Sequence, residues 1–324
     1  LYENSLAKCE FKNLISIITT EENIRLAYRN LKKNAGSRTP GTDGKTIADL
    51  AEMSESELIH VVQKKFEWYQ PQSVRRKEIP KGNGKTRPLG IPTIMDRLIQ
   101  QCILQVMEPI CEAKFCDTSN GFRPNRGVEN ALAQAEKHMQ TSNLHIVIDI
   151  DIKGFFDNVN HGKLLRQIWA MGIHDKKLLC IISAMLKAEV AGIGFPEKGT
   201  PQGGIISPLL SNIVLNELDW WITSQWVGMP TRHEYSGRIH ETGTKDQSKK
   251  YRELRKTKLK ECYIIRYADD FKIFCRKHSD AVKLFEATKA WLKDRLGLDI
   301  SPEKSKIVNL KHDYSDFLGF RIKV

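Results

Sequence analysis

The hydrophobic pattern of this chain changes repeatedly between the 3.6-residue period of helices and the two-residue period of strands. The helix after residue 20 shows the first period clearly: Thr20 is a suitable N-cap, and the apolar face consists of Ile24, Ala27, Tyr28 and Leu31. Further helices are predicted over residues 55–68, 93–110 and 128–140, up to residues 165 and 185, from residue 207 onward, and up to residue 296.

Runs rich in β-branched residues predict strands between these helices. Two short strands flank the Gly-rich basic turn in PKGNGKTRP (80–88), and LHIVIDIDI (144–152) is another strand. Strands are also predicted at EVAGIG (189–194), on both sides of residue 269, near residue 307, and as one final strand in DFLGFRIKV (316–324). This order indicates an α+β fold whose first part, up to about residue 120, is largely helical.

Composition narrows the class of protein. Of the 324 residues, 40% are hydrophobic and 28% are charged, as in folded soluble proteins. No apolar run is long enough for a membrane span, so we expect a cytoplasmic protein, in a prokaryotic cytosol, with no membrane partner. The seven cysteines include no Cys-x-x-Cys pair, and most are expected to be buried thiols.

The charge of the chain indicates a polyanionic partner. Lys and Arg outnumber Asp and Glu by 51 to 39, which gives a net charge of +12 and favours nucleic acid. Residues 75–87 hold six basic residues against one acidic residue, and residues 228–262 hold ten against five. Residues 226–261 also lose apolar periodicity, so we expect a surface insertion outside the core, facing RNA or partly mobile, whose deletion leaves the fold intact.

Two adjacent carboxylates, Asp269 and Asp270, interrupt the apolar run IIRYADDFKIF (264–274). By itself this pattern is typical of a solvated hairpin turn, because Asp is a favoured turn residue. A second acidic position changes the interpretation, since the strand at 144–152 carries two acids on one face and ends at Asp151. The alternative role for Asp151, as the cap of the next helix, suits Asp157 better because Asp157 lies closer to the start of that helix.

Carboxylates drawn together from separate strands repel each other unless divalent cations lie between them. Carboxylate oxygens are hard ligands that suit Mg²⁺, which also binds substrate phosphates. Two such ions can stabilise both the attacking and the leaving oxygen of a phosphoryl displacement. The acids at positions 151, 269 and 270 therefore predict metal-assisted phosphoryl transfer on a polyanion.

Several ordered blocks resemble the reverse transcriptases encoded by group II introns. The blocks similar to reverse transcriptases in general are DIKGFF (151–156), TPQGGIISPLLSNIVLNELD (200–219) and YADD (267–270). The blocks similar to the group II intron enzymes are AYRNLKKNAGSRTPGTDGKTI (27–47), RPLGIPTIMDRLIQQ (87–101) and NGFRPNRGVENAL (120–132). Together with the end of the chain, they extend the resemblance from about residue 20 to residue 322.

The resemblance implies a set of catalytic and metal-binding residues. The acids that bind two Mg²⁺ ions would be Asp151, Asp269 and Asp270, with the backbone carbonyl of Ile152 as an additional ligand. SPEKSKI (301–307) resembles the motif after the catalytic hairpin, which makes Lys304 a candidate proton donor.

The resemblance also implies residues that bind substrates. The nucleotide-binding positions are Lys81, Arg87, Phe156 and Gln202. Of these, Lys81 and Arg87 would hold the triphosphate, where a guanidinium fork suits phosphate oxygens, and Phe156 would lie beneath the incoming sugar. The loop that grips the primer end contains Phe317, Leu318 and Gly319.

The resemblance further implies a right-hand polymerase fold. Residues 1–70 would form an N-terminal extension and the start of the fingers, residues 71–143 the fingers, and residues 144–324 the palm with some fingers helices and the insertion at 226–261. A helical thumb, and sometimes an endonuclease module, follows in the family. Because this sequence stops at residue 324, we expect either a short gene or a chain cut to fingers and palm, with no thumb and with weakened primer and template binding.

The sequence thus predicts an RNA-directed DNA polymerase core from a group II intron-encoded protein. Its partners would be group II intron RNA, an RNA template with a DNA primer, and deoxynucleoside triphosphates; the sequence does not indicate an oligomeric state. One alternative is a maturase that binds intron RNA without catalysis, although three clustered carboxylates favour catalysis. The others are a metal-dependent nuclease, which does not require the nucleotide-binding positions, and a retron-type reverse transcriptase, against which GSRTPGTDG (36–44) argues.

Overall fold

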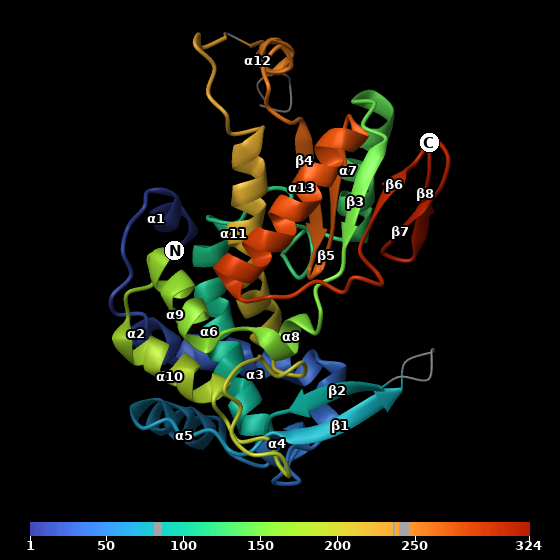
Figure 1. Cartoon of the computed structure of the whole chain (residues 1–324). Coiled ribbons are helices and arrows are strands. Elements are labelled where there is room, and N and C mark those ends of the chain that lie inside the picture. Colours follow the sequence, from blue (N-terminus) through green and yellow to red (C-terminus); the bar gives the residue numbers. More distant parts are fainter. Residues whose placement is uncertain (81–85, 236, 240–245) are drawn as a thin grey trace. The chain divides into compact units, whose positions relative to one another are not determined.

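The computed structural model describes residues 1–80, 86–235, 237–239 and 246–324 (Figure 1). The chain divides into two compact units that alternate along the sequence. Unit 1 comprises residues 1–115 and 154–214, and unit 2 comprises residues 116–153 and 215–324. These bounds differ from the predicted divisions after residues 70 and 143, and the assignment of fingers and palm stays a prediction.

Unit 1 is mainly helical. Its helices are α1 (Tyr2–Leu6), α2 (Ile15–Ile18), α3 (Glu21–Lys33), the 3-10 helix η1 (Ala35–Arg38), α4 (Ile47–Ala51), α5 (Glu55–Glu67), α6 (Ile94–Glu112), α8 (Phe155–Asn158), α9 (His161–Ala170) and α10 (Lys176–Leu186). The first three α-helices all pack against α6. The prediction for α3 is confirmed, because the hydroxyl of Thr20 accepts a hydrogen bond from the N–H of Asn23 and the predicted apolar face is turned inward.

The basic hairpin predicted in unit 1 is confirmed as an antiparallel ribbon. It consists of β1 (Arg75–Pro80) and β2 (Thr86–Ile91), paired from Arg75 opposite Ile91 to Pro80 opposite Thr86. Figure 1 shows this ribbon extending from the helices of unit 1. The connecting turn, residues 81–85, lies outside the described residues.

The predicted strand at residues 189–194 is wrong. The segment forms isolated bridges, from Val190 to Val74 and from Val190 to Gly194. Gly192 and Gly194 have φ values of 78° and 105°, which bend the chain into a tight turn that an extended strand does not allow. The hydrophobic pattern contains no signal for these two angles, and it therefore suggested a strand.

Unit 2 is built on a four-stranded antiparallel sheet in the order β4–β5–β3–β6. Its strands are β3 (Ile146–Ile150), β4 (Cys262–Tyr267), β5 (Asp270–Cys275) and β6 (Lys306–Asn309). Its helices are α7 (Val128–Glu136), continued by the π-helix η2 (Lys137–Thr141), and α13 (His278–Trp291), continued by the π-helix η3 (Leu292–Leu296). A further helix, α11 (Ser207–Gln225), begins at the predicted Ser207 and contributes residues to both units.

Helices cover both faces of this sheet. One face packs against α7 in a core that includes Ala131, Ala135, Val147, Ile265, Phe274 and Val308. On the opposite face, α13 packs against β3, β5 and β6, as Figure 1 shows. All five residues of β3 are buried, as expected for a strand covered on both sides.

The C-terminal segment forms two strands, which corrects the prediction of a single final strand. Here β7 (Ser315–Phe317) pairs with antiparallel β8 (Phe320–Ile322), and we call residues 315–322 the C-terminal hairpin. Its two turn residues, Leu318 and Gly319, both have positive φ, 54° and 85°. Two successive left-handed residues are typical of the tightest hairpin turns, so the chain reverses within an apolar stretch that otherwise resembles one strand.

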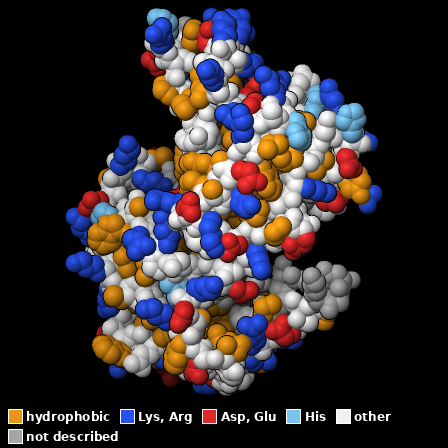
Figure 2. Space-filling model, in the orientation of Figure 1, with side chains coloured by type: hydrophobic (Ala, Val, Ile, Leu, Met, Phe, Trp, Pro, Cys, Tyr) orange, Lys and Arg blue, Asp and Glu red, His pale blue; other side chains and the backbone are white. Residues whose placement is uncertain are grey.

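Part of the 226–261 segment belongs to the core, which corrects the prediction of a wholly superficial insertion. Trp226 is fully buried, and its indole N–H donates a hydrogen bond of 3.0 Å to the hydroxyl of Tyr263. A short helix, α12 (Ser248–Leu254), returns to the core, where the ring of Tyr251 stacks on Trp226 and the last residue of the helix is buried. Lys249, Arg252, Arg255, Lys256 and Lys258 are nevertheless exposed in and after α12, and Figure 2 shows Lys and Arg side chains on this part of the surface among acidic and hydrophobic ones.

We expect Trp226→Ala to lower the free energy of unfolding by about 3–5 kcal/mol, because it empties a large buried site. Urea unfolding followed by circular dichroism measures the change. Ile239→Ala, at an exposed position of the same segment, is the control and should change stability by no more than about 0.5 kcal/mol. Equal unfolding midpoints for the two variants would show that the segment is superficial after all.

Within the described part of the chain, no helix has the length and apolar character needed to cross a membrane. Five of the seven cysteines are buried, in line with the prediction, while Cys9 and Cys180 are exposed.

Candidate active site

The three predicted acids line one cavity of unit 2, with a volume of about 480 Å³. Asp151 directly follows β3, Asp269 lies in the turn after β4, and Asp270 begins β5. Because β3 and β5 are neighbouring antiparallel strands, the C-terminal end of β3 lies beside the N-terminal end of β5, at the same end of the sheet. The other residues that line the cavity are Asp149, Ile150, Lys272, Glu303, Lys304, Lys306 and Asp316.

A buried ion pair holds the turn that carries Asp269 and Asp270. The guanidinium of Arg266, fully buried, donates hydrogen bonds of 2.6–3.0 Å to both carboxylate oxygens of Asp219. The same guanidinium donates a 2.7 Å hydrogen bond to the carbonyl of Ala268. Ala268 has φ of 57°, a left-handed conformation that costs energy for a residue with a side chain, so this contact stabilises the strained turn.

The segment at residues 118–121 forms backbone hydrogen bonds with Arg266, just before the same turn. The N–H of Arg266 donates to the carbonyl of Thr118 at 2.9 Å, and the N–H of Asn120 donates to the carbonyl of Arg266 at 2.8 Å. A side chain at Gly121 would collide with the backbone N of Ala268. Glycine at position 121 is therefore required for the close packing of this segment against the acid-bearing turn.

The carboxylate of Asp151 faces a loop formed by residues 301–305. The ammonium of Lys304 lies 3.2 and 3.3 Å from its two oxygens. The backbone of Asp151 is fixed as well, because its N–H donates to the hydroxyl of Ser305 and its carbonyl accepts from the N–H of Ser301. Since the side chains of Lys304 and Asp151 are 59% and 42% exposed, this ion pair is weak and a divalent cation is able to replace it.

The carbonyl of Ile152 is not used by the bridge in which that residue takes part. Ile152 forms an isolated antiparallel bridge with Ile300. The two hydrogen bonds of the bridge use the carbonyl of Asp151 and the N–H of Lys153. The geometry is therefore compatible with the expected role of the Ile152 carbonyl as a ligand.

The carboxylates in the cavity disfavour one another's charge. The pKa of Asp270 is raised to about 6, mainly because burial disfavours the charged form, and further because the carboxylates of Asp149 and Asp269 are near. Lys272 and a hydrogen bond from the backbone of Leu318 act in the opposite direction. A cation bound among these groups would relieve the repulsion.

Among the described residues, no three His, Cys, Asp and Glu side chains form a ready-made metal cage. Mg²⁺ does not require one, because it retains several waters and usually binds one or two carboxylates together with substrate phosphates. The hard oxygen donors around the cavity and the raised pKa of Asp270 fit such an ion. The residues present are therefore suited to a divalent cation that binds together with a phosphate-bearing substrate.

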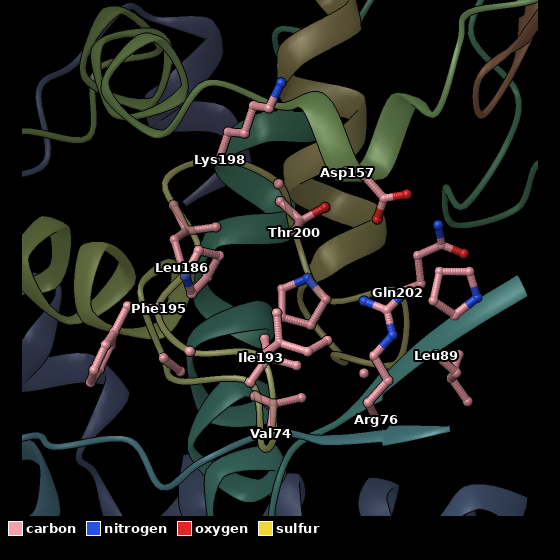
Figure 3. A pocket seen from close by; sticks show the side chains of 18 residues that line it. Val74, Arg76, Leu89, Asp157, Leu186, Ile193, Phe195, Lys198, Thr200 and Gln202 are labelled. Carbon is pink, nitrogen blue, oxygen red and sulfur yellow. The ribbon is translucent and has the colours of Figure 1, made fainter. Parts of the chain in front are cut away.

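The predicted nucleotide-binding residues all belong to unit 1. Lys81 lies outside the described residues, and for Arg87 only the backbone, which pairs with Ile79, is described. Gln202 lines a cavity of about 250 Å³ together with Arg76 of β1. Figure 3 shows these two polar side chains on one side of the cavity, while residues such as Leu186 and Phe195 line the other side.

Phe155 and Phe156 differ in their exposure to solvent. Phe155 is only 2% exposed, whereas Phe156 is half-buried, and their rings meet edge to face at 5.3 Å. The carbonyl of Phe156 accepts a 2.7 Å hydrogen bond from the N–H of Thr200. This bond links α8 to the loop that carries Gln202.

Glycine in that loop has a packing reason. A side chain at Gly203 would collide with the carbonyl oxygen of Gly90 in β2. A side chain at Gly204 would lie 2.7 Å from the hydroxyl oxygen of Ser207, where α11 begins. The two glycines thus let the loop lie directly against β2 and the first turn of α11.

The helix cap assigned to Asp157 is wrong. The side chain of Asn160 caps α9 by accepting a 2.8 Å hydrogen bond from the N–H of Lys163. Asp157 lies inside α8, a separate one-turn helix, and lines the cavity around Gln202. The prediction failed because the sequence pattern did not separate α8 from α9.

The predicted primer-gripping residues lie at the tip of the C-terminal hairpin in unit 2: Phe317 ends β7, and Leu318 and Gly319 form the turn. Phe317 is buried, Leu318 is half-buried and Gly319 is exposed. Two buried polar residues close to this turn and to the acids, Lys272 and Ser315, were not predicted from the sequence. The one available signal was the charge of Lys272 inside the apolar run DFKIFC (270–275), since a buried charge requires a partner.

Comparison with known proteins adds independent evidence. A family described as reverse transcriptase (RNA-dependent DNA polymerase) matches residues 79–322 of this chain. The Escherichia coli protein YkfC is 33% identical, over 96% of this chain and 83% of that protein. The group II intron-encoded protein LtrA of Lactococcus lactis is 34% identical over 92% of this chain, and a COX1/OXI3 intron 2 protein of Saccharomyces cerevisiae is 27% identical over 100%. The alignments span 54% of LtrA and 40% of the yeast protein.

Proposed function

This chain belongs to the reverse transcriptase (RNA-dependent DNA polymerase) family, and we propose that it is the polymerase core of a group II intron-encoded protein. It would add deoxynucleotides to a DNA primer on an RNA template. The observation that carries this proposal is that Asp151, Asp269 and Asp270 line the same cavity of unit 2. The similarity to LtrA supports the connection with group II introns.

Asp151, Asp269 and Asp270 would hold two Mg²⁺ ions, with the carbonyl of Ile152 as a further ligand. When bound, the ions stabilise the charge that develops on the attacking and leaving oxygens. The residues of the chain keep these oxygen donors in place: the Arg266–Asp219 pair fixes the turn that carries two of them.

The ammonium of Lys304 would deliver a proton to the leaving group. Its position next to Asp151 supports this role, because the ammonium is 3.2 Å from a proposed metal ligand and is itself exposed to solvent. An ammonium group carries three N–H donors and suits a general acid when it is placed at the leaving group.

The remaining residues would bind the substrates. Lys81 and Arg87 would contact the triphosphate, Gln202 would lie beside the nucleotide and template, and Phe156 would lie beneath the sugar. The turn of the C-terminal hairpin, with Leu318 and Gly319 at its tip, would hold the primer end. The half-buried state of Phe156 supports its role, since a residue that contacts substrate has to be accessible.

Primer extension tests the proposed function. A labelled DNA primer annealed to an RNA template, with all four deoxynucleoside triphosphates and Mg²⁺, should be extended to the end of the template, and EDTA should stop the reaction. Tight binding without extension would identify an RNA-binding maturase. Cleavage of the template without extension would identify a nuclease.

We expect RNA binding to weaken steeply with salt, because Lys and Arg contacts to phosphates release counterions. If about 6 phosphates are neutralised, log K should fall with log salt at a slope of about −4 to −5 on single-stranded RNA. Fluorescence anisotropy at several salt concentrations measures the slope. A flat titration would exclude an electrostatic mode of binding.

A triple variant tests whether RNA contacts the region in and after α12. Lys249, Arg252 and Lys258 are exposed in and after α12, and changing all three to Gln should make the slope less steep by about 2 if each contacts one phosphate. An unchanged slope would move the RNA contact away from the α12 region.

A further inference from the structure

A layer of polar side chains is buried in unit 2 next to the acidic cavity. Lys272 of β5 lies opposite Asp149 of β3, and its ammonium is 3.0 Å from a carboxylate oxygen of Asp149. Only 6% and 8% of these two side chains are exposed. The hydroxyl of Ser315 in β7, which is fully buried, donates to the same carboxylate at 2.8 and 3.0 Å. We call these three residues the polar layer.

The polar layer lies between the apolar core and the acidic cavity. Side chains two residues apart on a strand share a face. Two residues away in one direction, Val147 and Phe274 belong to the apolar core under α7. Two residues away in the other direction, Asp151 and Asp270 line the acidic cavity. The polar layer thus forms the boundary between the core and the proposed metal site.

Stability alone does not account for a charged pair in this position. Removing two charges from water is costly, and well-packed apolar residues in place of a buried ion pair often give equal or greater stability. β5 is otherwise apolar on both sides of Lys272, with Phe271 and Ile273 as its neighbours. The pair therefore needs an explanation other than packing.

The polar layer connects the C-terminal hairpin to the acids. Ser315, at the start of the hairpin, belongs to the layer itself. The ammonium of Lys272 lies over the ring of Phe317, 5.5 Å from its centroid, and 4.0 Å from a carboxylate oxygen of Asp270. At the tip of the hairpin, the backbone of Leu318 forms a hydrogen bond with the carboxylate of Asp270. The hairpin thus contacts the layer at its base and a proposed metal ligand at its tip.

We propose that Asp149, Lys272 and Ser315 are positioning residues that lock the C-terminal hairpin to Asp270, so that the primer-holding turn and the metal-binding carboxylate keep one fixed geometry. This inference rests on the proposed function, because it takes the hairpin as the primer contact and Asp270 as a metal ligand. If the lock is released, the hairpin shifts and Asp270 loses the hydrogen bond that orients it. Both metal binding and the alignment of the primer end then suffer.

Ser315→Ala tests the lock, and Ser5→Ala is a matched control. Each change removes one fully buried hydroxyl that donates to an oxygen acceptor, but Ser5 binds the carbonyl of Ile110 in unit 1 and does not line the acidic cavity. In Ser315→Ala, we expect hydrogen–deuterium exchange over residues 315–322 to become faster. We also expect Mn²⁺ alone, followed by electron paramagnetic resonance, to bind about 10- to 100-fold more weakly, as is usual when a residue that supports a metal ligand is lost. Ser5→Ala should change neither quantity.

A double variant removes the charges without leaving one of them unpaired. Lys272→Met alone would leave the Asp149 carboxylate buried without its cation, and such a protein is at risk of not folding. Lys272→Met combined with Asp149→Asn avoids this loss. We expect the double variant to keep a thermal midpoint close to that of the wild type and to bind Mn²⁺ more weakly. Its maximal rate of primer extension should fall, with little change in the KM for the nucleotide.

The outcomes separate this inference from the proposed function. If exchange and Mn²⁺ affinity in Ser315→Ala match those of Ser5→Ala, the lock is refuted, whatever the activity of the wild type. If the wild type fails to extend any primer, the proposed function is refuted, while the exchange measurement still decides whether the hairpin is held by the polar layer. A double variant with normal Mn²⁺ affinity and a normal maximal rate would also refute the lock.

Discussion

Asp151→Asn is expected to abolish DNA synthesis while RNA affinity stays equal or rises slightly. The substitution keeps the size of the side chain but removes a charged ligand, and the loss of several kcal/mol of metal-assisted stabilisation corresponds to a rate decrease of about 10³-fold or more. RNA affinity should not fall, because the substitution removes a negative charge that would repel the phosphates of a bound nucleic acid. Single-turnover primer extension and anisotropy measure the two effects.

A control variant distinguishes loss of a ligand from loss of charge. Glu303→Gln removes a carboxylate from the same cavity at a position that is not a proposed ligand, and we expect most of the activity to remain. If Asp151→Asn extends primers at the wild-type rate, or if Glu303→Gln is equally inactive, Asp151 is not a specific metal ligand.

The two adjacent acids should differ in importance. Asp269→Asn is expected to resemble Asp151→Asn, whereas Asp270→Asn should have a somewhat smaller effect, because neighbouring residues at a strand end point in different directions. Single-turnover rates of the three Asn variants give the order directly.

Phe156→Val is expected to admit ribonucleotides. A polymerase that makes DNA must reject a sugar with one additional hydroxyl, and a pocket that merely lacks a partner for that hydroxyl rejects it poorly. A ring beneath the sugar supplies a steric barrier instead. Shortening it should lower the discrimination between deoxynucleotides and ribonucleotides by about 10- to 200-fold, with deoxynucleotide use less affected. The ratio of kcat/KM for the two nucleotides measures the effect.

The neighbouring phenylalanine is the matched control. Phe155 is 2% exposed, so Phe155→Val should reduce stability through a core cavity and leave sugar selection unchanged. The half-buried position of Phe156 supports this division of roles. If Phe156→Val unfolds and Phe155→Val accepts ribonucleotides, the two roles have been assigned in the wrong order.

The fold could be predicted where the determinants are local. The cap and apolar face of α3, the β-branched run of β3 and the alternation on both sides of residue 269 are all properties of short segments. The tight turn at residues 189–194 and the reversal at Leu318 and Gly319 depend on backbone angles that hydrophobic patterns do not encode. The buried Trp226 contacts Tyr263, 37 positions further along the chain. The segment between them is polar on average, so its composition does not indicate that its first residue is buried.

In the candidate site as well, residues with a local sequence signal could be predicted and residues that depend on distant contacts could not. The meeting of Asp151, Asp269 and Asp270 in one cavity could be predicted because each lies at a strand end in a distinctive block, and adjacent strands bring such ends together. The residues that position them could not. Arg266 and Asp219 are 47 positions apart, and Ser315 and Asp149 are 166 positions apart. Such pairs become visible only when the sheet and the C-terminal hairpin are assembled.

Addition of a single nucleotide to a labelled DNA primer on an RNA template tests the central claim most directly. Each deoxynucleoside triphosphate is supplied separately with Mg²⁺, and the next template base is varied. If the chain is an RNA-directed DNA polymerase, only the complementary nucleotide is added efficiently, the product changes with the template base, and Asp151→Asn adds none. A folded wild-type protein that binds the primer–template but adds no nucleotide, or adds nucleotides without regard to the template base, would contradict the claim.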